Sequence, residues 1–163
     1  MAKSKKKAIS PNDLEEVLME FLAEAVDTAT DFALNYLCKY IQKNWYNKYD
    51  PTSYKRTYDF LASATKTDVS ITPKNEVVTL IYFDINKIIP ELRKNKLSAH
   101  AGFNGQSFAE MLPSVIERGG HFYGRGTAKG LGSIEATISM LEKDFPVRVK
   151  KELEKKGLKV NII

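Results

Sequence analysis

Apolar residues recur at helical spacing over the first third of the chain. Between Pro11 and Lys48 there is no glycine and no internal proline. The spacing predicts one helix of about 50 Å or more. That length exceeds the diameter of a compact domain of this size, so we expect another chain to cover part of the apolar stripe. The stripe consists of Leu14, Val17, Leu18, Phe21, Leu22, Ala25, Ala29, Phe32, Ala33, Tyr36, Leu37, Tyr40 and Ile41.

The ends of this segment carry recognisable start and stop signals. Ser10 is a good N-cap residue and Pro11 suits the first helical position, so the helix should begin at residues 10–12. It should end near Tyr49, because the Asp-Pro pair that follows disfavours helical geometry. The run from Asp27 to Thr30 is weak in helix propensity, which leaves a kink or break open.

Aromatic residues gather around the end of the long helix. Ser53 is placed to cap a short helix that contains Tyr54, Tyr58 and Leu61. We interpret the cluster as a corner of the core rather than a base-stacking platform. It comprises Trp45, Tyr46, Tyr49, Tyr54, Tyr58 and Phe60.

The pattern then changes from helical to strand periodicity. Asp68–Thr72 alternates as a half-buried strand, Pro73–Glu76 has the composition of a turn, and Val77–Ile85 reads as the returning strand of a hairpin. Both faces of the second strand are apolar. We therefore expect cover on two sides, by helices or by a neighbouring subunit.

The segment after the hairpin is less regular. Asn86–Leu97 is compatible with a loop or an irregular helix, and Gln106–Glu117 predicts a helix interrupted by Pro113. Six glycines between Gly119 and Gly132 predict a long surface loop, and a second interpretation is a loop that becomes ordered on a partner. Its glycine spacing matches neither a P-loop nor a dinucleotide-binding fingerprint.

A final helix closes the predicted fold. Ser133 is placed to cap it, Pro146 either kinks it or starts a second helix, and Gly157 is a good stop. The sequence thus predicts an α+β fold in which a long N-terminal helix and a C-terminal helix pack on a small antiparallel sheet built around a hairpin. We expect a basic flexible tail (1–9), a single domain (10–157) and an apolar C-terminal tail (158–163), which adds an edge strand or docks on a partner.

The charge balance adds one candidate partner. The net charge is +5, and four of the positive charges belong to Lys3, Lys5, Lys6 and Lys7. We interpret these lysines as a solvated tail. They would attract a polyanion such as double-stranded DNA in a salt-dependent way without reading its sequence. A small basic DNA-binding protein is therefore the alternative function.

The sequence lacks the signatures of several other classes. No stretch approaches the roughly 18 apolar residues of a membrane span. Cys38 is the single cysteine, which excludes an intrachain disulfide and fits a reducing cytoplasm. His100 and His121 do not fit a zinc spacing with it. There is no nucleophile elbow and no carboxylate pair of the kind that a nuclease uses. We expect no catalytic residue, metal or cofactor, and no enzyme.

Three short motifs together resemble a known family. They are NWYNKYDP at 44–51, YKRTYDFL at 54–61 and VIERG at 115–119. With the order of predicted elements, they resemble the small tail-component proteins of long-tailed bacteriophages and prophages, which are neck or tail-completion proteins. The likeness covers most of residues 10–157. It is absent from Ile88–Gln106 and from the glycine-rich segment, so tail completion, tail terminator and head closure all stay open.

The resemblance implies a non-enzymatic virion protein, made in the host cytoplasm and placed in the neck or tail. It implies a ring of identical subunits around the DNA path, a hexamer or a dodecamer, in contact with neighbouring neck, head-completion or tail proteins. By similarity, Tyr54, Arg56, Thr57, Leu61, Glu117 and Gly119 match family-like positions, and Arg56 and Glu117 are a hypothetical ion pair. The full set of interface candidates is Phe32, Tyr36, Tyr40, Trp45, Tyr49, Tyr54, Arg56, Glu117, Gly119, Phe122, Tyr123 and Arg125.

Overall fold

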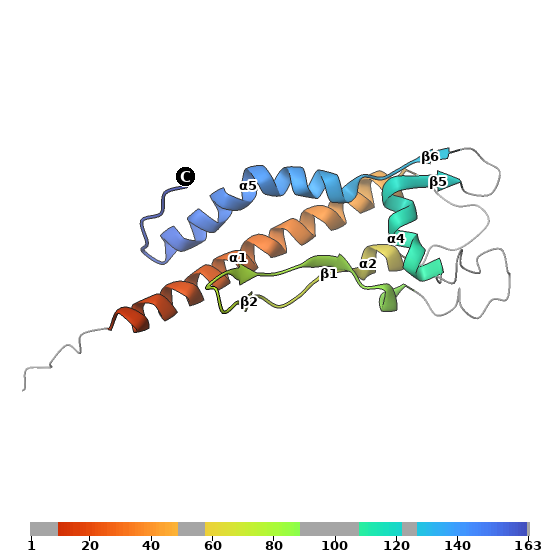
Figure 1. Ribbon diagram of the computed structural model, residues 1–163. Helices are drawn as coiled ribbons and strands as arrows, with labels where there is room; N and C mark the ends of the chain where they lie inside the picture. The colour runs from red at the N-terminus through yellow and green to blue at the C-terminus, as the bar shows by residue number, and fades with distance from the viewer. Residues whose placement is uncertain (1–9, 49–57, 89–107, 122–126, 163) are drawn as a thin grey trace, which may run out of the picture.

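One long helix forms the axis of the molecule. The computed structural model describes residues 10–48, 58–88, 108–121 and 127–162. Helix α1 (Pro11–Ile41) runs between helix α5 (Ser133–Lys155) on one side and a β-hairpin on the other, and helix α4 (Phe108–Arg118) crosses near its end (Figure 1). This arrangement confirms the predicted α+β fold.

Helix α1 begins where the sequence predicts. The Ser10 hydroxyl accepts the N–H of Asp13 at 3.1 Å, and the Asp13 carboxylate accepts the N–H of Ser10 at 3.1 Å, which completes a capping box. The helix is continuous through Asp27–Thr30, so the possible break there does not occur. It passes into a short π-helix, Gln42–Tyr46. The expected last residue, Tyr49, lies outside the described part.

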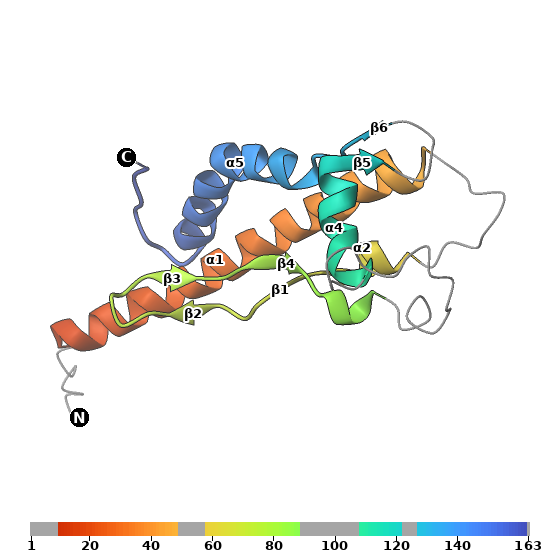
Figure 2. The ribbon, with the colours of Figure 1, turned by 45° about the vertical axis from the view of Figure 1, so that its right-hand side comes forward.

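The hairpin contains two pairs of short strands. The strands are β1 (Ala64–Lys66), β2 (Ser70–Ile71), β3 (Val77–Val78) and β4 (Ile81–Phe83). β1 pairs with β4 and β2 pairs with β3, both antiparallel (Figure 2). The turn at Pro73–Glu76 is confirmed, and Asn75 adopts the left-handed conformation there.

The hairpin is interrupted by a bulge that the sequence did not predict. Three residues, Thr67–Val69, lie opposite only two, Thr79 and Leu80, so the register shifts by one between the two strand pairs. The Thr67 hydroxyl accepts the N–H of Leu80 at 3.0 Å, and the Thr79 hydroxyl donates to the carbonyl of Thr67 at 3.1 Å. These side-chain bonds replace the regular ladder, so the expected continuous strand Val77–Ile85 is wrong.

Two other expectations are corrected near the hairpin. The expected short helix is α2 (Asp59–Ser63), which begins after Tyr58 in the left-handed conformation, while Ser53 and Tyr54 lie outside the described residues. β1 follows α2 directly. The sequence ATK carries little strand propensity, and it is a strand because its partner β4 lies beside it.

The glycine-rich segment also contains strands. β5 (Gly119–His121) pairs antiparallel with β6 (Thr127–Lys129), so the expectation of one long loop from Gly119 to Gly132 is wrong. Glycine is unfavourable in strands, so the residue pattern did not predict a strand here. A short 3₁₀-helix, Ile85–Lys87, follows β4, where the sequence was compatible with a loop or an irregular helix.

The core lies where the end of α1 meets the hairpin base and α4. Phe60 stacks on Phe83 with ring centroids 4.7 Å apart, and Tyr46 stacks on Tyr58 at 4.6 Å. The aromatic segment is thus a corner of the core, as expected. The buried members are Leu37, Ile41, Tyr46, Phe60, Ile88 and Ile116, with Trp45 and Leu61 packed against them.

One ion-pair cluster ties the hairpin to α1. The Lys66 ammonium lies 2.5 Å from Asp27 Oδ1 and 2.7 Å from Asp31 Oδ1. Burial alone lowers the pKa of Lys66, but hydrogen bonds and charge from the two aspartates outweigh it, so the pKa is raised above 10.5. A raised lysine pKa means that the stabilisation is complete below about pH 10.5 and is lost as the pH rises through the folded-state pKa.

We predict a pH-dependent effect of Lys66→Met. The loss in free energy of unfolding should stay constant from about pH 7 to about pH 9 and should shrink above about pH 10.5. Urea unfolding across this range measures it. In a protein that also carries Asp27→Asn and Asp31→Asn, the effect of Lys66→Met on the free energy of unfolding should no longer change at alkaline pH. An unchanged pH dependence in this background would show that the two aspartates do not cause it.

We also predict that Ile41→Ala destabilises the protein by about 2–5 kcal/mol, because Ile41 is fully buried and the change leaves a cavity. The matched control is Leu80→Ala, whose side chain is exposed, with an expected effect within about 0.5 kcal/mol. Urea unfolding of dilute protein compares the two variants. Equal losses would contradict the placement of the core.

Candidate functional site

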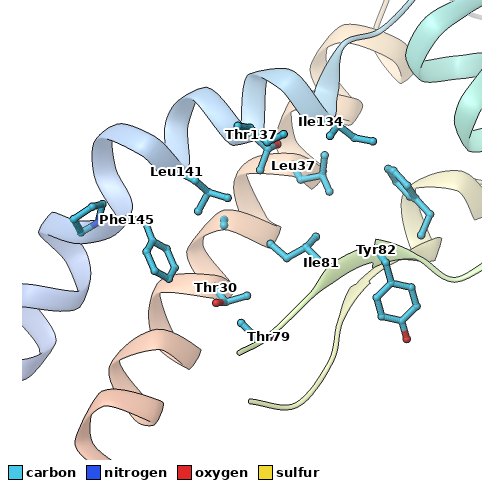
Figure 3. Close-up of a pocket in the computed structure, with 13 residues that line it drawn as sticks. Thr30, Leu37, Thr79, Ile81, Tyr82, Ile134, Thr137, Leu141 and Phe145 are labelled. Carbon is cyan, nitrogen blue, oxygen red and sulfur yellow. The ribbon is translucent and has the colours of Figure 1, made fainter. Parts of the chain in front are cut away.

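A groove opens between α5, β4 and α1. Its volume is about 490 Å³. Ile81, Leu141 and Phe145 point into it from facing elements (Figure 3). No carboxylate, histidine, cysteine or basic residue is among its described lining residues, so it is suited to packing rather than to acid–base chemistry. The main lining residues are Ile134, Ile138, Leu141 and Phe145 of α5, Ile81 and Phe83 of β4, and Thr30, Ala33 and Leu37 of α1.

A second apolar surface lies on the hairpin. Val77, Thr79 and the odd-numbered residues of β4 are half-buried, whereas Val78, Leu80 and Tyr82 are 39%, 61% and 45% exposed. We call these three residues the hairpin outer face. The predicted alternation of the strand is therefore confirmed. Within the described residues, however, only one of its two apolar faces is covered.

Both helices also expose apolar residues. Near the start of α1, Leu14 is 51% exposed, and Val17 and Leu18 lie beside it in the same stripe. On α5, Ile138 is 49% exposed at the rim of the groove. Large apolar surface left open on several elements is typical of a protein that packs against further chains.

Glu117 has a structural partner in the first turn of α5. Its side chain is buried, the Ser133 hydroxyl donates to one carboxylate oxygen, and the N–H of Ile134 donates to the other at 3.0 Å. The expected N-cap, Ser133, is instead the first helical residue, and the N-cap position is Gly132. A carboxylate from another helix takes over the capping role and favours the positive end of the helix dipole.

The glycines near Glu117 allow close backbone contact. The N–H of Leu131 donates to the Ile116 carbonyl at 2.8 Å, and the N–H of Gly132 donates to the Glu117 carbonyl at 3.2 Å. A Cβ at Gly130 would overlap the carbonyl of Glu117. Glycine at this position thus lets the end of α4 meet the start of α5, which is a structural role and not a phosphate cradle.

Several expected interface residues have contacts within the chain. The Arg148 guanidinium carbon lies 3.1 Å from the centroid of the Phe32 ring, and the rings of Tyr36 and Tyr40 are 6.3 Å apart. Trp45 packs against the core, and Gly119 begins β5 with a positive φ.

The other candidates lie outside the described residues, so the hypothetical Arg56–Glu117 pair stays a prediction. These candidates are Lys3, Lys5, Lys6, Lys7, Tyr49, Tyr54, Arg56, Phe122, Tyr123 and Arg125.

The groove itself was missed by sequence reasoning. Ile81 and Ile138 are far apart in the sequence, and each lies in an element whose pattern only indicates a buried face. The hairpin outer face did have a signal, because Val78, Leu80 and Tyr82 alternate with another apolar set. Pattern alone could not decide which of the two sets would be covered.

The remaining chemistry-bearing side chains give little support for a reactive site. Cys38 is half-buried, and burial raises the pKa of its thiol, which keeps the thiol protonated near neutral pH. Within the described ranges, no three acidic, histidine or cysteine side chains gather as a metal site. None of the described helices is both long enough and apolar enough to cross a membrane.

Comparison with known proteins identifies the family. The YomN family model matches residues 10–159. The chain belongs to the YomN family. This family is associated with phages and prophages, so the protein is phage-related. No curated protein and no solved structure gives a significant match.

We predict that Glu117→Ala lowers the free energy of unfolding by about 1–3 kcal/mol, because the Ser133 hydroxyl and the Ile134 N–H lose their buried acceptor. The control is Glu135→Ala, an exposed residue in the first turn of α5, for which we expect a loss of about 0.5 kcal/mol. Urea unfolding gives both values. Equal losses in the free energy of unfolding for Glu135→Ala and Glu117→Ala would contradict a stabilising role of the buried Glu117 carboxylate.

Proposed function

We propose that this YomN-family protein is a non-enzymatic structural subunit of a phage particle that acts at the head–tail junction, as a neck or tail-completion subunit. The main support is the hairpin outer face, where three large apolar side chains are exposed together on one ribbon. In a subunit that assembles, this surface would be buried against a neighbour. The phage association of the family agrees with a role in the particle.

Assembly of identical copies into a closed ring is the arrangement we propose. A ring requires two different surfaces on each subunit, because every contact is heterologous. The described part of the chain offers two: the hairpin outer face and the groove beside α5. Both include residues of β4, and Tyr82 belongs to both, but Val78 and Leu80 do not line the groove, whereas the α5 and α1 residues of the groove do not belong to the hairpin. The hexamer and the dodecamer remain the two candidate sizes.

DNA is the second proposed partner. In a ring around the DNA path, Lys3, Lys5, Lys6 and Lys7 would contact phosphates without reading sequence. Deleting residues 1–8 tests this contribution, because DNA affinity that does not change would exclude these lysines. A small DNA-binding protein stays the alternative function. It does not explain the apolar groove or the hairpin outer face.

We predict that Leu80→Glu with Tyr82→Glu abolishes self-association, because burying two carboxylates against a neighbour is strongly unfavourable. Both side chains are exposed, so the free energy of unfolding of the single chain should change by less than about 1 kcal/mol. Sedimentation velocity over a concentration series measures association. The control is Lys48→Glu, an exposed change remote from the hairpin.

The role in the particle has its own test. Phage particles made without the protein should accumulate unjoined heads and tails, visible by negative-stain microscopy. Heads and tails that join normally in its absence would contradict the neck proposal, even if the protein self-associates.

A further inference from the structure

Among the described residues, strand β4 is paired along one edge only, and its other edge faces the groove. The backbone N–H of Asp84 donates to the Ser63 carbonyl, and the backbone N–H of Thr67 donates to the Leu80 carbonyl. The backbone groups of the even-numbered residues in and beside β4 therefore point toward β1. In an antiparallel pair the backbone groups of alternate residues point to opposite edges. The N–H and C=O groups of Ile81 and Phe83 therefore point away from β1. Since β4 lines the groove and β1 does not, this free edge lies on the groove side.

The segment after α5 has the pattern of a strand without a described strand partner. In Leu158–Ile162, apolar residues occupy alternate positions, and Lys159 and Asn161 lie between them. This segment is not assigned to any helix or strand, and Ile162 is half exposed. A strand added to β4 would place its apolar face toward α1 and α5 and its polar face toward solvent.

The charges of the two parts are complementary. Between the first and last lining residue of each element (30–37, 79–83 and 134–146) the chain has four acidic residues and one basic residue, none of which lines the groove itself. Lys66 balances part of this charge through its ion pair with Asp31. The segment Leu158–Ile162 carries Lys159 and no acidic residue, whereas Lys155 and Lys156 before it pair with Glu152 and Glu24 of the same chain. The four acidic residues are Asp31, Glu135, Glu142 and Asp144.

The segment cannot lie along the groove of its own chain. Five residues extend over at most about 17 Å. The helix between Pro146, at the near end of the groove, and Leu158 already covers about 18 Å. A segment that folds back along α5 would thus reach only the near end of the groove. Figure 2 shows it at the far end of α5 from Ser133.

We propose that Leu158–Ile162 of one copy adds as a strand to the free edge of β4 in a second copy and fills the groove between α5 and β4. The inference rests on the proposed self-assembly and names one of its contacts. The donor segment and the acceptor groove are different parts of the surface, so the contact is head-to-tail. Repetition of this contact closes a ring when the rotation between copies suits.

Photochemical cross-linking of the full chain tests the contact directly. We would place p-benzoylphenylalanine at position 160, mix light and heavy-isotope copies, irradiate them and sequence the linked peptides. The expected links join position 160 of one copy to residues 79–83 or 134–146 of the other isotopic copy. The same photoreactive group at position 43, on the exposed surface of the π-helix, should give no link to the groove.

A matched pair of substitutions tests the same contact without a probe. Val160→Lys puts a charge on the apolar face of the strand, whereas Asn161→Lys puts the same charge on its polar face. We expect the first to raise the concentration for half-assembly about tenfold or more and the second to change it about twofold or less. Circular dichroism and urea unfolding of both variants confirm that the chain remains folded.

The outcomes separate this contact from the proposed function. Wild-type oligomers with no link to the groove, or with equal effects of the two lysine substitutions, overturn the strand contact and leave self-assembly standing. Links only within one isotopic copy overturn the assignment to a second copy. A wild-type chain that neither associates nor cross-links overturns both. Inter-copy links to the groove together with selective loss in Val160→Lys support the proposal.

Discussion

The fold depends on the packing of α1, which contacts both α5 and strands of the hairpin. Its buried face contains Ala25, Ala29 and Ala33, one residue in four, and each is almost inaccessible. Small residues at this spacing form a shallow row into which the side chains of another helix can pack closely. The most extensive contact of α1 is with α5. Because α1 has about 46 Å of length to cover, the elements beside it can shield only part of its surface.

That constraint explains which apolar residues remain exposed. Residues 10–18 are exposed even though the Asn75 amide of the hairpin turn donates to the Glu15 carboxylate there, so Leu14 stays uncovered although it belongs to the same stripe as Leu37. In the part of the chain that the structure describes, the hairpin is two strands wide, and one of its faces packs on the helices while the other is exposed. A two-stranded ribbon with an apolar outer face is poorly stabilised by itself. Contact with another chain would bury the apolar outer face and so stabilise the ribbon.

The junction between α4 and α5 shows how a family-like motif can be structural. Glu117 and Gly119 invite an interpretation as interface residues, yet Glu117 is buried and holds the first turn of α5. It fixes where α5 starts and hence how α5 lies over the groove. The glycine at 130 permits the same junction by close backbone contact. In the assembly that we propose, the motif would act indirectly, by positioning the surface that meets a neighbour.

The sequence by itself determined the elements whose signals are local. The Ser10 cap, the hairpin turn and the Gly157 stop all follow from interactions between residues a few positions apart, whereas the sequence left open whether the long helix would break at Asp27–Thr30. The class of fold follows too, because hydrophobic period distinguishes helices from strands. The aromatic corner around Phe60 was also foreseeable, since large rings concentrated in one short segment need a common core.

The tertiary structure alone decided the rest. β1 and β5 have weak strand propensity and are strands because a partner lies beside them. The bulge at Thr67–Val69 arises from threonine bonds across the hairpin, and Ser133 lost its capping role to a carboxylate sixteen residues earlier in the chain. The groove joins residues more than fifty positions apart. Periodicity reports which face of an element is apolar, but the partner that covers that face depends on contacts between distant segments, which no local pattern encodes.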